Sequence, residues 1–282
     1  MISILMPVYN GAMYIDKTIQ SVLKNNFKNF EFLIIDDGST DNTAEIIKSF
    51  SDYRIKYFKK QNSGIAETLN FGLKKTNFEL VARIDSDDLI KSNRLEMQYN
   101  YFKYNKIDVL GSNAYLIDQN DNVLGNTRFP LTHQQIKKKL EKMECSIIHP
   151  SVMYKKSKIL SVGGYREKYA DDYELWLRLI KNSSFENLSN SLLYLRKHSN
   201  NLSSSKPNTT QTIIVNSLIN YYNYSGADIN ELKNNFINSK STLLIKLNNK
   251  RSLLKRLIIL PLYLKVEFLK KIILIRIKCI RY

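Results

Sequence analysis

Cysteine is scarce in this sequence and long uncharged apolar runs are missing from it, which argues against several classes of protein. The 282 residues include two cysteines, Cys145 and Cys279, which lie far apart and offer neither zinc-ligand spacing nor a disulfide framework. We therefore expect a reducing, cytoplasmic location. Within residues 246–282, no stretch reaches the roughly 18 uncharged residues of a membrane-spanning helix. We also expect no signal peptide, because no basic segment precedes the apolar run 2–8 and no small-residue cleavage site follows it.

Acidic residues are too few to balance the basic ones, and the excess charge is concentrated near the end of the sequence. The chain carries 43 Lys and Arg against 26 Asp and Glu, a net charge of +17. Residues 246–282 contain eleven of the basic residues and a single acid, Glu267, and so account for +10. Such an excess is typical of proteins that bind nucleic acid, an anionic membrane or an acidic substrate.

The basic segment 246–282 also contains apolar runs, at 257–264 and 272–275, with Lys or Arg every few residues. Pro261 would kink any helix there. The pattern favours an amphipathic segment that lies on an anionic membrane surface. The alternative is a helix packed on the rest of the protein, with its basic face in solvent. Nucleic acid is a weaker interpretation, because the basic residues lie in a largely aliphatic segment.

Apolar runs and helical spacing alternate in the first third of the chain. The runs 2–8, 30–35, 54–58 and 80–84 predict strands, and helical spacing lies between them at 15–23, around 44–47 and at 65–75. Strand 30–35 is nearly continuous in apolar residues, as expected for a parallel strand covered on both faces. This order predicts an α/β fold with right-handed crossovers and a doubly wound, mostly parallel sheet.

The pattern is less regular further along. We expect helices at 94–104, at 133–143 and from Asp171 onward, strands at 108–111, 146–154 and 191–196, and a hairpin at 116–124. The Ser-, Asn- and Thr-rich run 199–210 predicts a loop or linker, with helix from about residue 211. The sequence therefore suggests three parts: 1–110, 111–205 and a basic helical extension, 206–282.

Three polar clusters, 7–10, 36–39 and 85–88, follow predicted strands. In an open α/β sheet, ligands bind at the carboxyl ends of the strands, so the clusters are expected on one edge. The third contains Asp85, Asp87 and Asp88, whose charges repel one another unless a cation lies among them. Mg²⁺ and Mn²⁺ take oxygen ligands and share them with substrate phosphates. The alternative is a solvated acidic turn, since Asp is a common turn residue.

Six short motifs occur along the chain. They are Pro-Val-Tyr-Asn at 7–10, Asp-Asp-Gly-Ser at 36–39, Asp-Ser-Asp-Asp at 85–88, His-Pro-Ser-Val at 149–152, Asp-Asp-Tyr-Glu-Leu-Trp at 171–176 and Tyr-Leu-Arg-Lys-His at 194–198. Each is weak alone, but together and in this order they resemble the family 2 (GT-A fold) inverting glycosyltransferases of the bacterial surface-polysaccharide type. The resemblance covers about residues 2–203.

The resemblance implies a nucleotide-sugar site at the first two clusters and the start of the third. The corresponding residues are Pro7, Val8, Tyr9, Asn10, Asp37, Asn62, Gly64, Arg83, Asp85 and Ser86. In the family, the Pro-x-Tyr-Asn strand end and the second Asp of the Asp-Asp-Gly-Ser turn hold the nucleotide base. From the residues alone, Asn10 could instead cap the following helix, and Arg83 could be a structural ion-pair partner.

The third cluster resembles the family's metal-binding Asp-x-Asp signature. The resemblance implies Asp87 as the principal ligand of Mn²⁺ or Mg²⁺, with Asp85 and Asp88 as further ligands. It also implies that His198 completes the metal shell or touches the diphosphate, as a His does in some relatives. In the family, the ion bridges the diphosphate and stabilises the charge that develops on the leaving nucleoside diphosphate. Asp88 could instead interact with the metal ligands without binding the ion itself.

An inverting transfer also needs a base for the proton of the acceptor hydroxyl, and a carboxylate suffices. The family places this base as the last acid of a Glu-Asp pair at a helix start, which matches Asp172. A helix start favours the ionised form of a carboxyl group. Asp171 stands where the family has Glu, which leaves its supporting role open. Both acids could instead simply cap the helix.

The resemblance extends to acceptor-binding residues, which correspond to His149, Asp171, Trp176 and Arg178. Trp176 is the only tryptophan, and it could stack on a sugar face or anchor the core. His149 could line the acceptor pocket or be structural.

Taken together, the resemblance implies a metal-dependent inverting glycosyltransferase. It would move a single sugar from a nucleoside-diphosphate sugar, with UDP expected, to a hydroxyl of a surface-glycan or lipid-linked acceptor. The processive members carry membrane helices and a Gln-x-x-Arg-Trp motif, and this sequence has neither. With the basic segment, we expect a cytoplasmic protein that is peripheral on the inner face of the membrane. The alternatives are a nucleotidyltransferase and a non-catalytic nucleotide-sugar binder.

Overall fold

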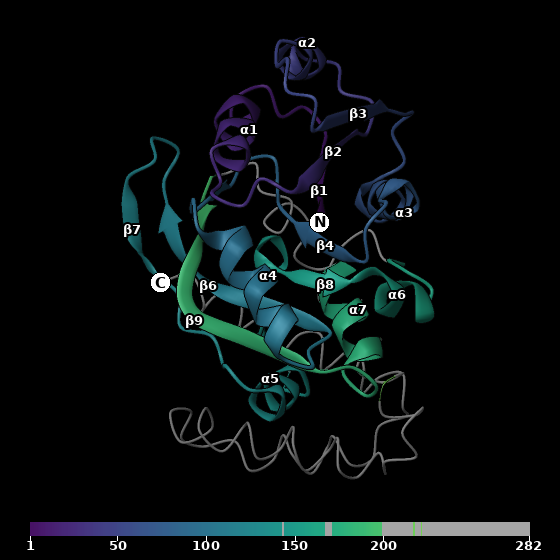
Figure 1. Ribbon diagram of the computed structural model, residues 1–282, viewed down its shortest axis with the longest axis vertical. Coiled ribbons are helices and arrows are strands. Elements are labelled where there is room, and N and C mark those ends of the chain that lie inside the picture. The colour runs from purple at the N-terminus through teal and green to yellow at the C-terminus, as the bar shows by residue number, and fades with distance from the viewer. Residues whose placement is uncertain (143, 167–170, 199–216, 218–220, 222–282) are drawn as a thin grey trace, which may run out of the picture. The chain divides into compact units, whose positions relative to one another are not determined.

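A computed structural model describes residues 1–142, 144–166, 171–198, 217 and 221 (Figure 1). The chain divides into two units, 1–201 and 202–282, of which the first is described below. The linker expected at 199–210, the helix expected from 211 and the basic segment 246–282 lie outside the described residues. Within the described part, no helix has both the length and the apolar character needed to cross a bilayer.

Strands and helices alternate in the first part of the chain. They are β1 (Ile2–Val8), α1 (Ile15–Leu23), β2 (Phe30–Asp36), α2 (Thr43–Lys48), β3 (Ile55–Lys59), α3 (Ile65–Lys75) and β4 (Leu80–Arg83). The second part is mixed. It contains β5 (Leu89–Ile90), α4 (Arg94–Tyr104), β6 (Val109–Ile117), β7 (Val123–Asn126), α5 (His133–Leu140), a 3₁₀ turn (His149–Ser151), β8 (Met153–Lys155), α6 (Lys156–Ser161), α7 (Asp171–Leu179) and β9 (Phe185–Arg196).

The nine strands form a single mixed sheet in the order β3-β2-β1-β4-β8-β6-β9-β5, with β7 paired to β6. The first four strands are parallel, and β8 is antiparallel to both β4 and β6. The predicted α/β fold with helices around a doubly wound sheet is confirmed. The β4–β8 pairing joins the segments on either side of residue 110 into the same sheet, and their division into two functional halves stays a prediction.

Successive side chains of β1 point to opposite faces of the sheet, and a helix packs against each face. Ile4 and Met6 pack with Ile15 and Ile19 of α1 in one core cluster. The opposite face meets α3, where a Cβ on Gly72 would lie 2.3 Å from the end of the Leu5 side chain, so a larger residue there would force Leu5 to move. Figure 1 shows α1 and α3 on opposite sides of β1. Each fully buried aliphatic side chain contributes roughly 1.5–3 kcal/mol to this packing.

Four local predictions are wrong. The strand expected at 146–154 is interrupted by the 3₁₀ turn at His149–Ser151, because Pro150 has no N–H for a strand ladder, and β8 begins only at Met153. The strand expected at 191–196 begins already at Phe185, and the one expected at 108–111 continues to Ile117. Asn10 does not cap α1, which begins after Tyr14.

Candidate functional site

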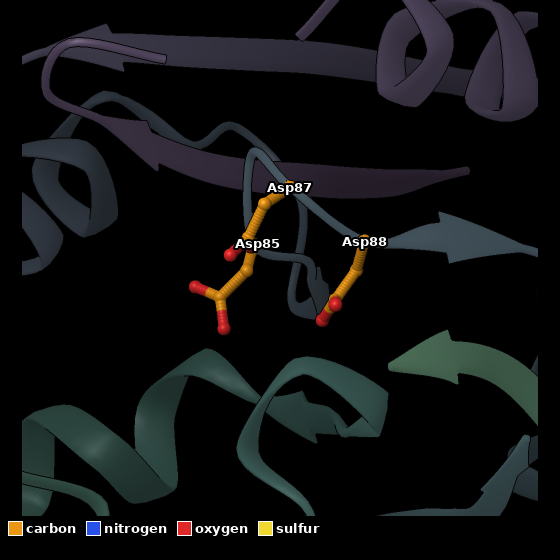
Figure 2. Close-up of side chains that lie close together, drawn as sticks. All are labelled: Asp85, Asp87 and Asp88. Atoms are coloured by element: carbon orange, nitrogen blue, oxygen red, sulfur yellow. The ribbon is translucent and has the colours of Figure 1, made fainter. Parts of the chain in front are cut away.

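The acidic turn that follows β4 brings three carboxylates together. One oxygen from each of Asp85, Asp87 and Asp88 lies within 4.8 Å of the others. Figure 2 shows the three side chains leaving the same turn. Asp88 is 1% exposed, and its Oδ2 has no hydrogen-bond partner among the described residues. A buried carboxylate oxygen with no donor beside it is costly unless a cation or a proton takes that place.

The carboxylates of this turn raise one another's affinity for protons. Burial raises the pKa of Asp88 well above its usual range, and the charges of Asp87 and Asp85 raise it further. Burial and the Asp85 charge also raise the pKa of Asp87, while the hydrogen bond to His198 acts in the opposite direction. The turn therefore favours any group that adds positive charge among its oxygens, as a divalent cation does.

His198 reaches the same turn from the end of β9. Its Nε2 lies 2.8 Å from Asp87 Oδ2, and its ring lies against Tyr14, with 5.2 Å between the ring centroids. This position places an imidazole nitrogen beside the carboxylate of Asp87. Oxygen and imidazole ligands together suit Mn²⁺, and carboxylates alone suit Mg²⁺.

Arg83 and Arg94 support the turn from the protein interior. Arg83 is 3% exposed and forms an ion pair with Asp85. The buried Arg94 donates from Nη2 to the Arg83 carbonyl at 2.8 Å, and burial lowers the pKa of Arg94 to about 9. Arg83 therefore places a fixed positive charge beneath the acidic turn, in the position that the sequence suggested for an ion-pair partner.

The end of β1 lies on the same edge of the sheet as the acidic turn, beside the residues that follow β2. Pro7 and Val8 are buried, and the Val8 carbonyl accepts the N–H of Asp37 at 2.8 Å. Tyr9 is 53% exposed at this edge. Asn10 adopts a left-handed conformation (φ 51°), and its Oδ1 accepts the N–H of Thr40 at 2.9 Å.

Asp37 holds the loop between β3 and α3. Its Oδ1 accepts the N–H of Ser63 at 2.9 Å and its Oδ2 that of Gly64 at 2.8 Å, and it forms an ion pair with Lys60. Burial alone would raise the pKa of Asp37, but the hydrogen bonds from Lys60, Ser63 and Gly64 outweigh it and lower the pKa. Sequence reasoning missed Lys60, and its only signal is a basic residue two positions before Asn62 in a polar loop.

Two further predicted residues are placed by their backbones at this edge. The Asn62 N–H nitrogen lies so near Gly38 that a Cβ on the glycine would approach it to 2.9 Å. Gly38 also has φ +81°, so the turn requires glycine on both counts. The Ser86 carbonyl accepts the Thr18 hydroxyl at 2.9 Å, which ties the acidic turn to α1.

Asp172 lies in the first turn of α7. Its Oδ1 accepts the N–H of Tyr173 at 2.7 Å. Burial raises the pKa of Asp172, and the charges of Arg83 and Asp85 also act on it, in opposite directions. The structure therefore brings Asp172 into the electrostatic field of the acidic turn. The side chain of Asp171 lies outside the described residues.

Trp176 and His149 are buried in this structure, and their assignment to the acceptor site stays a prediction. Trp176 is 1% exposed, and its ring meets both His149 and Phe185 edge-on at 5.7 Å between centroids. His149 Nε2 lies 3.0 Å from the Tyr165 hydroxyl, and burial and the Arg83 charge lower its pKa well below the usual value.

Arg178 makes several contacts within its own surroundings, and its assignment to the acceptor site stays a prediction. Its Nε and Nη2 each donate to the Glu174 carboxylate at 2.6 Å. Nη2 also donates to the Gly164 carbonyl at 2.7 Å, and Nη1 donates to the Val162 carbonyl. The guanidinium therefore ties α7 to the turn before it.

Arg196 is a site residue that sequence reasoning missed. Its N–H donates to Asp88 Oδ1 at 2.8 Å and its Nε to the Asp87 carbonyl at 2.7 Å, so it contacts the last two residues of the acidic turn. Its signal was present in the motif at 194–198, where only His198 received a role.

Comparison with known proteins decides the family. The family model described as Glycosyl transferase family 2 matches residues 3–163. The chain belongs to this family. It is 34% identical over 207 residues to the O-antigen biosynthesis glycosyltransferase WbnJ of Escherichia coli, an alignment that spans 70% of this chain and 80% of WbnJ. The family 2 chain is therefore a transferase of glycosyl groups, as its motifs predicted.

Two further comparisons extend this result. The chain is 33% identical over 187 residues to the E. coli protein named UDP-Glc:alpha-D-GlcNAc-diphosphoundecaprenol beta-1,3-glucosyltransferase WfgD, covering 65% of this chain and 71% of WfgD. The crystal structure of Staphylococcus aureus TarS 1–349 with UDP-GlcNAc superposes with a TM-score of 0.63 and 22% identity, covering 77% of this chain and 66% of TarS. The second likeness confirms the GT-A fold.

Proposed function

We propose that this glycosyltransferase moves a single sugar, with inversion, from a nucleoside-diphosphate sugar to a hydroxyl of a surface-glycan or lipid-linked acceptor. The observation that carries the proposal is the meeting of Asp85, Asp87 and Asp88 on one edge. The charge of Asp85 also acts on the carboxyl of Asp172 and raises its pKa. UDP is the expected nucleotide, because WfgD is named for a UDP-sugar donor. The names of WbnJ and WfgD support a role in polysaccharide biosynthesis on a lipid carrier.

The residues of the acidic turn fit a divalent cation. Asp85, Asp87, Asp88 and His198 would hold Mn²⁺ or Mg²⁺, and the unpartnered Asp88 Oδ2 is an oxygen that such an ion satisfies. When bound, the ion supplies positive charge that stabilises the leaving nucleoside diphosphate. Arg83 neutralises part of the negative charge of the turn through Asp85.

The nucleotide base fits the region around Tyr9 and Asp37. The exposed Tyr9 ring offers a stacking face, and the backbone at Pro7 and Val8 offers polar groups at the strand end. Asp37 Oδ2 accepts one hydrogen bond from Gly64, which leaves capacity for the N–H of a uracil. The loop that contains Asn62 and Gly64 would close over the nucleotide.

Asp172 is the proposed base. As the acceptor oxygen forms its bond to the anomeric carbon, the bond from that carbon to the phosphate oxygen breaks, and the hydroxyl proton passes to the Asp172 carboxylate. Attack from the face opposite the leaving group inverts the configuration. The raised pKa of Asp172 brings it closer to that of an effective base near neutral pH.

The basic segment 246–282 would bring the enzyme to its acceptor by lying on the anionic inner face of the membrane. Its charge of +10 supports this, since each Lys or Arg near such a surface contributes about 1 kcal/mol. We further propose that residues 1–110 bind the donor, that 111–205 bind the acceptor and that 206–282 form the membrane-binding extension. Binding to vesicles with and without anionic lipid, for the full chain and for 1–205, tests this arrangement.

Donor hydrolysis tests the whole proposal. The protein is incubated with a panel of nucleotide sugars and Mn²⁺ or EDTA, and the released nucleoside diphosphate is measured. Turnover of one donor that is lost with EDTA and in Asp87→Ala is the expected result. Release of pyrophosphate in a parallel incubation with a nucleoside triphosphate and a sugar 1-phosphate would favour a nucleotidyltransferase, which has no need of Asp172. Failure to bind any nucleotide sugar would contradict the proposal.

A further inference from the structure

Arg196 is a buried arginine at the end of β9 that donates hydrogen bonds to the acidic turn (residues 85–88) from both its backbone and its side chain. Arg196 is 0% exposed. Its N–H donates to Asp88 Oδ1, and its Nε donates to the main-chain carbonyl of Asp87. The first bond fixes one carboxylate of the turn, and the second fixes the peptide that follows Asp87. Neither bond uses the Asp87 carboxylate, which stays directed to His198.

The other side of the same guanidinium reaches the turn between β6 and β7. Arg196 Nη1 donates to the Asp118 carbonyl at 2.9 Å and forms an ion pair with Asp121 Oδ1 at 2.6 Å. The Tyr14 ring lies over it, 4.6 Å from the Cζ atom to the ring centroid. Lys17 of α1 pairs with Asp121 as well. One buried cation thus connects the acidic turn to the β6–β7 turn and to the segment before α1.

We propose that Arg196 is a positioning residue that sets the acidic turn in the conformation that binds the divalent cation. Three neighbouring carboxylates repel one another, so the turn would spread apart unless another group held it together. A hydrogen bond to the backbone of the turn does this and leaves carboxylate oxygens available for a cation. Arg196 supplies that hydrogen bond at the Asp87 carbonyl. The inference rests on the metal site proposed above, and it concerns a residue that holds the ligands in place.

The chemistry of the side chain explains why arginine is needed. A guanidinium is planar and donates from Nε and Nη1 in fixed, divergent directions, so it bridges the Asp87 carbonyl and the β6–β7 turn at once. A lysine ammonium is a compact group on a flexible stem and can satisfy one of these acceptors at a time. Arg196→Lys therefore keeps the charge and removes the bridge.

Direct binding of Mn²⁺ separates positioning from mere stabilisation. Full-length wild type, Arg196→Lys and Lys17→Ala are titrated with Mn²⁺ in the presence of UDP, and free Mn²⁺ is measured by electron paramagnetic resonance. We expect Arg196→Lys to raise the Mn²⁺ dissociation constant at least tenfold. Lys17→Ala removes the other cation on Asp121 and leaves the bonds to the acidic turn, so it should change the constant less than twofold. Equal weakening in both variants would overturn the proposal, as would wild-type affinity in Arg196→Lys.

A second readout comes from donor hydrolysis at increasing Mn²⁺. Because the ligands remain present, kcat of Arg196→Lys should return to within threefold of wild type when Mn²⁺ is saturating. If circular dichroism shows that Arg196→Lys does not fold, Asp121→Asn takes its place. It weakens the anchor of Nη1 and is expected to weaken Mn²⁺ binding three- to tenfold, and unchanged binding would refute the inference. Absence of Mn²⁺ binding to the wild type would contradict the proposed metal site itself.

Discussion

His198 Nε2 lies 2.8 Å from Asp87 Oδ2, although 111 positions separate the two residues in the chain. The contact exists because β9 runs parallel to β6 and pairs with β5, the strand that follows the acidic turn, so the end of β9 lies beside that turn. It adds a nitrogen to a group of oxygens that already lie within 4.8 Å of one another. The metal site proposed above takes ligands from two distant segments and so depends on each of them, and this dependence can be measured.

Removing Asp87 should abolish the metal site, whereas removing His198 should weaken it. We expect Asp87→Ala to lower donor hydrolysis more than 100-fold and to eliminate measurable Mn²⁺ binding. His198→Ala should weaken Mn²⁺ binding about 10- to 100-fold, the range typical for partners that support metal ligands. Calorimetry with Mn²⁺ and UDP measures both. Asp16→Ala, at an exposed acid of α1, is the control, and EDTA-sensitive turnover that survives Asp87→Ala would contradict the assignment.

Asp172→Asn should stop transfer without weakening donor binding. Loss of a general base lowers kcat by about 10²–10⁴-fold. Because burial raises the pKa of Asp172, the wild-type activity should decline as pH falls through a value above the ordinary 3.8 of an aspartate. The same raised pKa means that the ionised carboxylate destabilises the fold at neutral pH, so Asp172→Asn should melt at an equal or higher temperature. Wild-type turnover in Asp172→Asn would remove Asp172 from the mechanism.

The positions of the strand ends could be predicted from the sequence. Apolar runs that end abruptly in polar residues identify β1, β2 and β4, and parallel pairing then places Asp37 and Asp87 on the same edge. The helix at Ile65–Lys75 follows from its apolar spacing with the expected bounds. Local pattern and the direction of the strands suffice for these features, because neither depends on contacts between residues that are distant in the chain.

Other features do depend on contacts between distant residues, which one sequence does not reveal. Arg196 is buried because its charge is met by Asp121 and by carbonyls of two separate turns. A charged residue at a strand end gives no sign of this. Nothing near Trp176 in the sequence shows that Phe185 and His149 pack around it.

Glu31 provides a stability prediction that is independent of catalysis. It is 4% exposed at the amino end of β2, on the edge opposite the candidate site, and accepts hydrogen bonds from Ser3 at 2.6 Å, Lys56 at 2.6 Å and Asn77 at 2.6 and 2.7 Å. Glu31→Gln loses the ion pair with Lys56, and its amide N–H then faces one of the groups that donate a hydrogen bond to Glu31. We expect the free energy of unfolding to fall by about 2 kcal/mol, with kcat unchanged.

The pH dependence of this contribution has a definite sign. Burial alone would raise the pKa of Glu31, but the hydrogen bonds from Lys56, Ser3 and Asn77 outweigh it and lower the pKa below 4.5. Its stabilisation is therefore complete above pH 4.5 and is lost as pH falls through the lowered value. Urea unfolding at several pH values, with the exposed Glu67→Gln as control, measures this, and a loss that persists below both pKa values would contradict it.

Lys60→Met should weaken donor binding by disturbing Asp37. Lys60 pairs with Asp37 and donates to the Ser63 hydroxyl at 2.6 Å, so it holds both the carboxylate and the loop over the nucleotide region. Without it, the pKa of Asp37 rises and one buried charge loses its partner, which should cost about 2 kcal/mol of stability. We expect the donor KM to rise about tenfold, while the Mn²⁺ dissociation constant measured without nucleotide stays within twofold of wild type.

Lys59→Met is the matched control for Lys60→Met, because the two lysines are adjacent and only one touches Asp37. Lys59 donates from Nζ to the Ser39 carbonyl at 3.0 Å, and its removal leaves the bonds from Ser63 and Gly64 to Asp37 in place. The donor KM of Lys59→Met should therefore change less than threefold. Since Asp37 would bind the base and the acidic turn would bind the diphosphate, a change in KM confined to Lys60→Met places base recognition at Asp37. If both lysine variants raise KM equally, general loss of positive charge near the donor explains the effect, and Asp37 loses its proposed role.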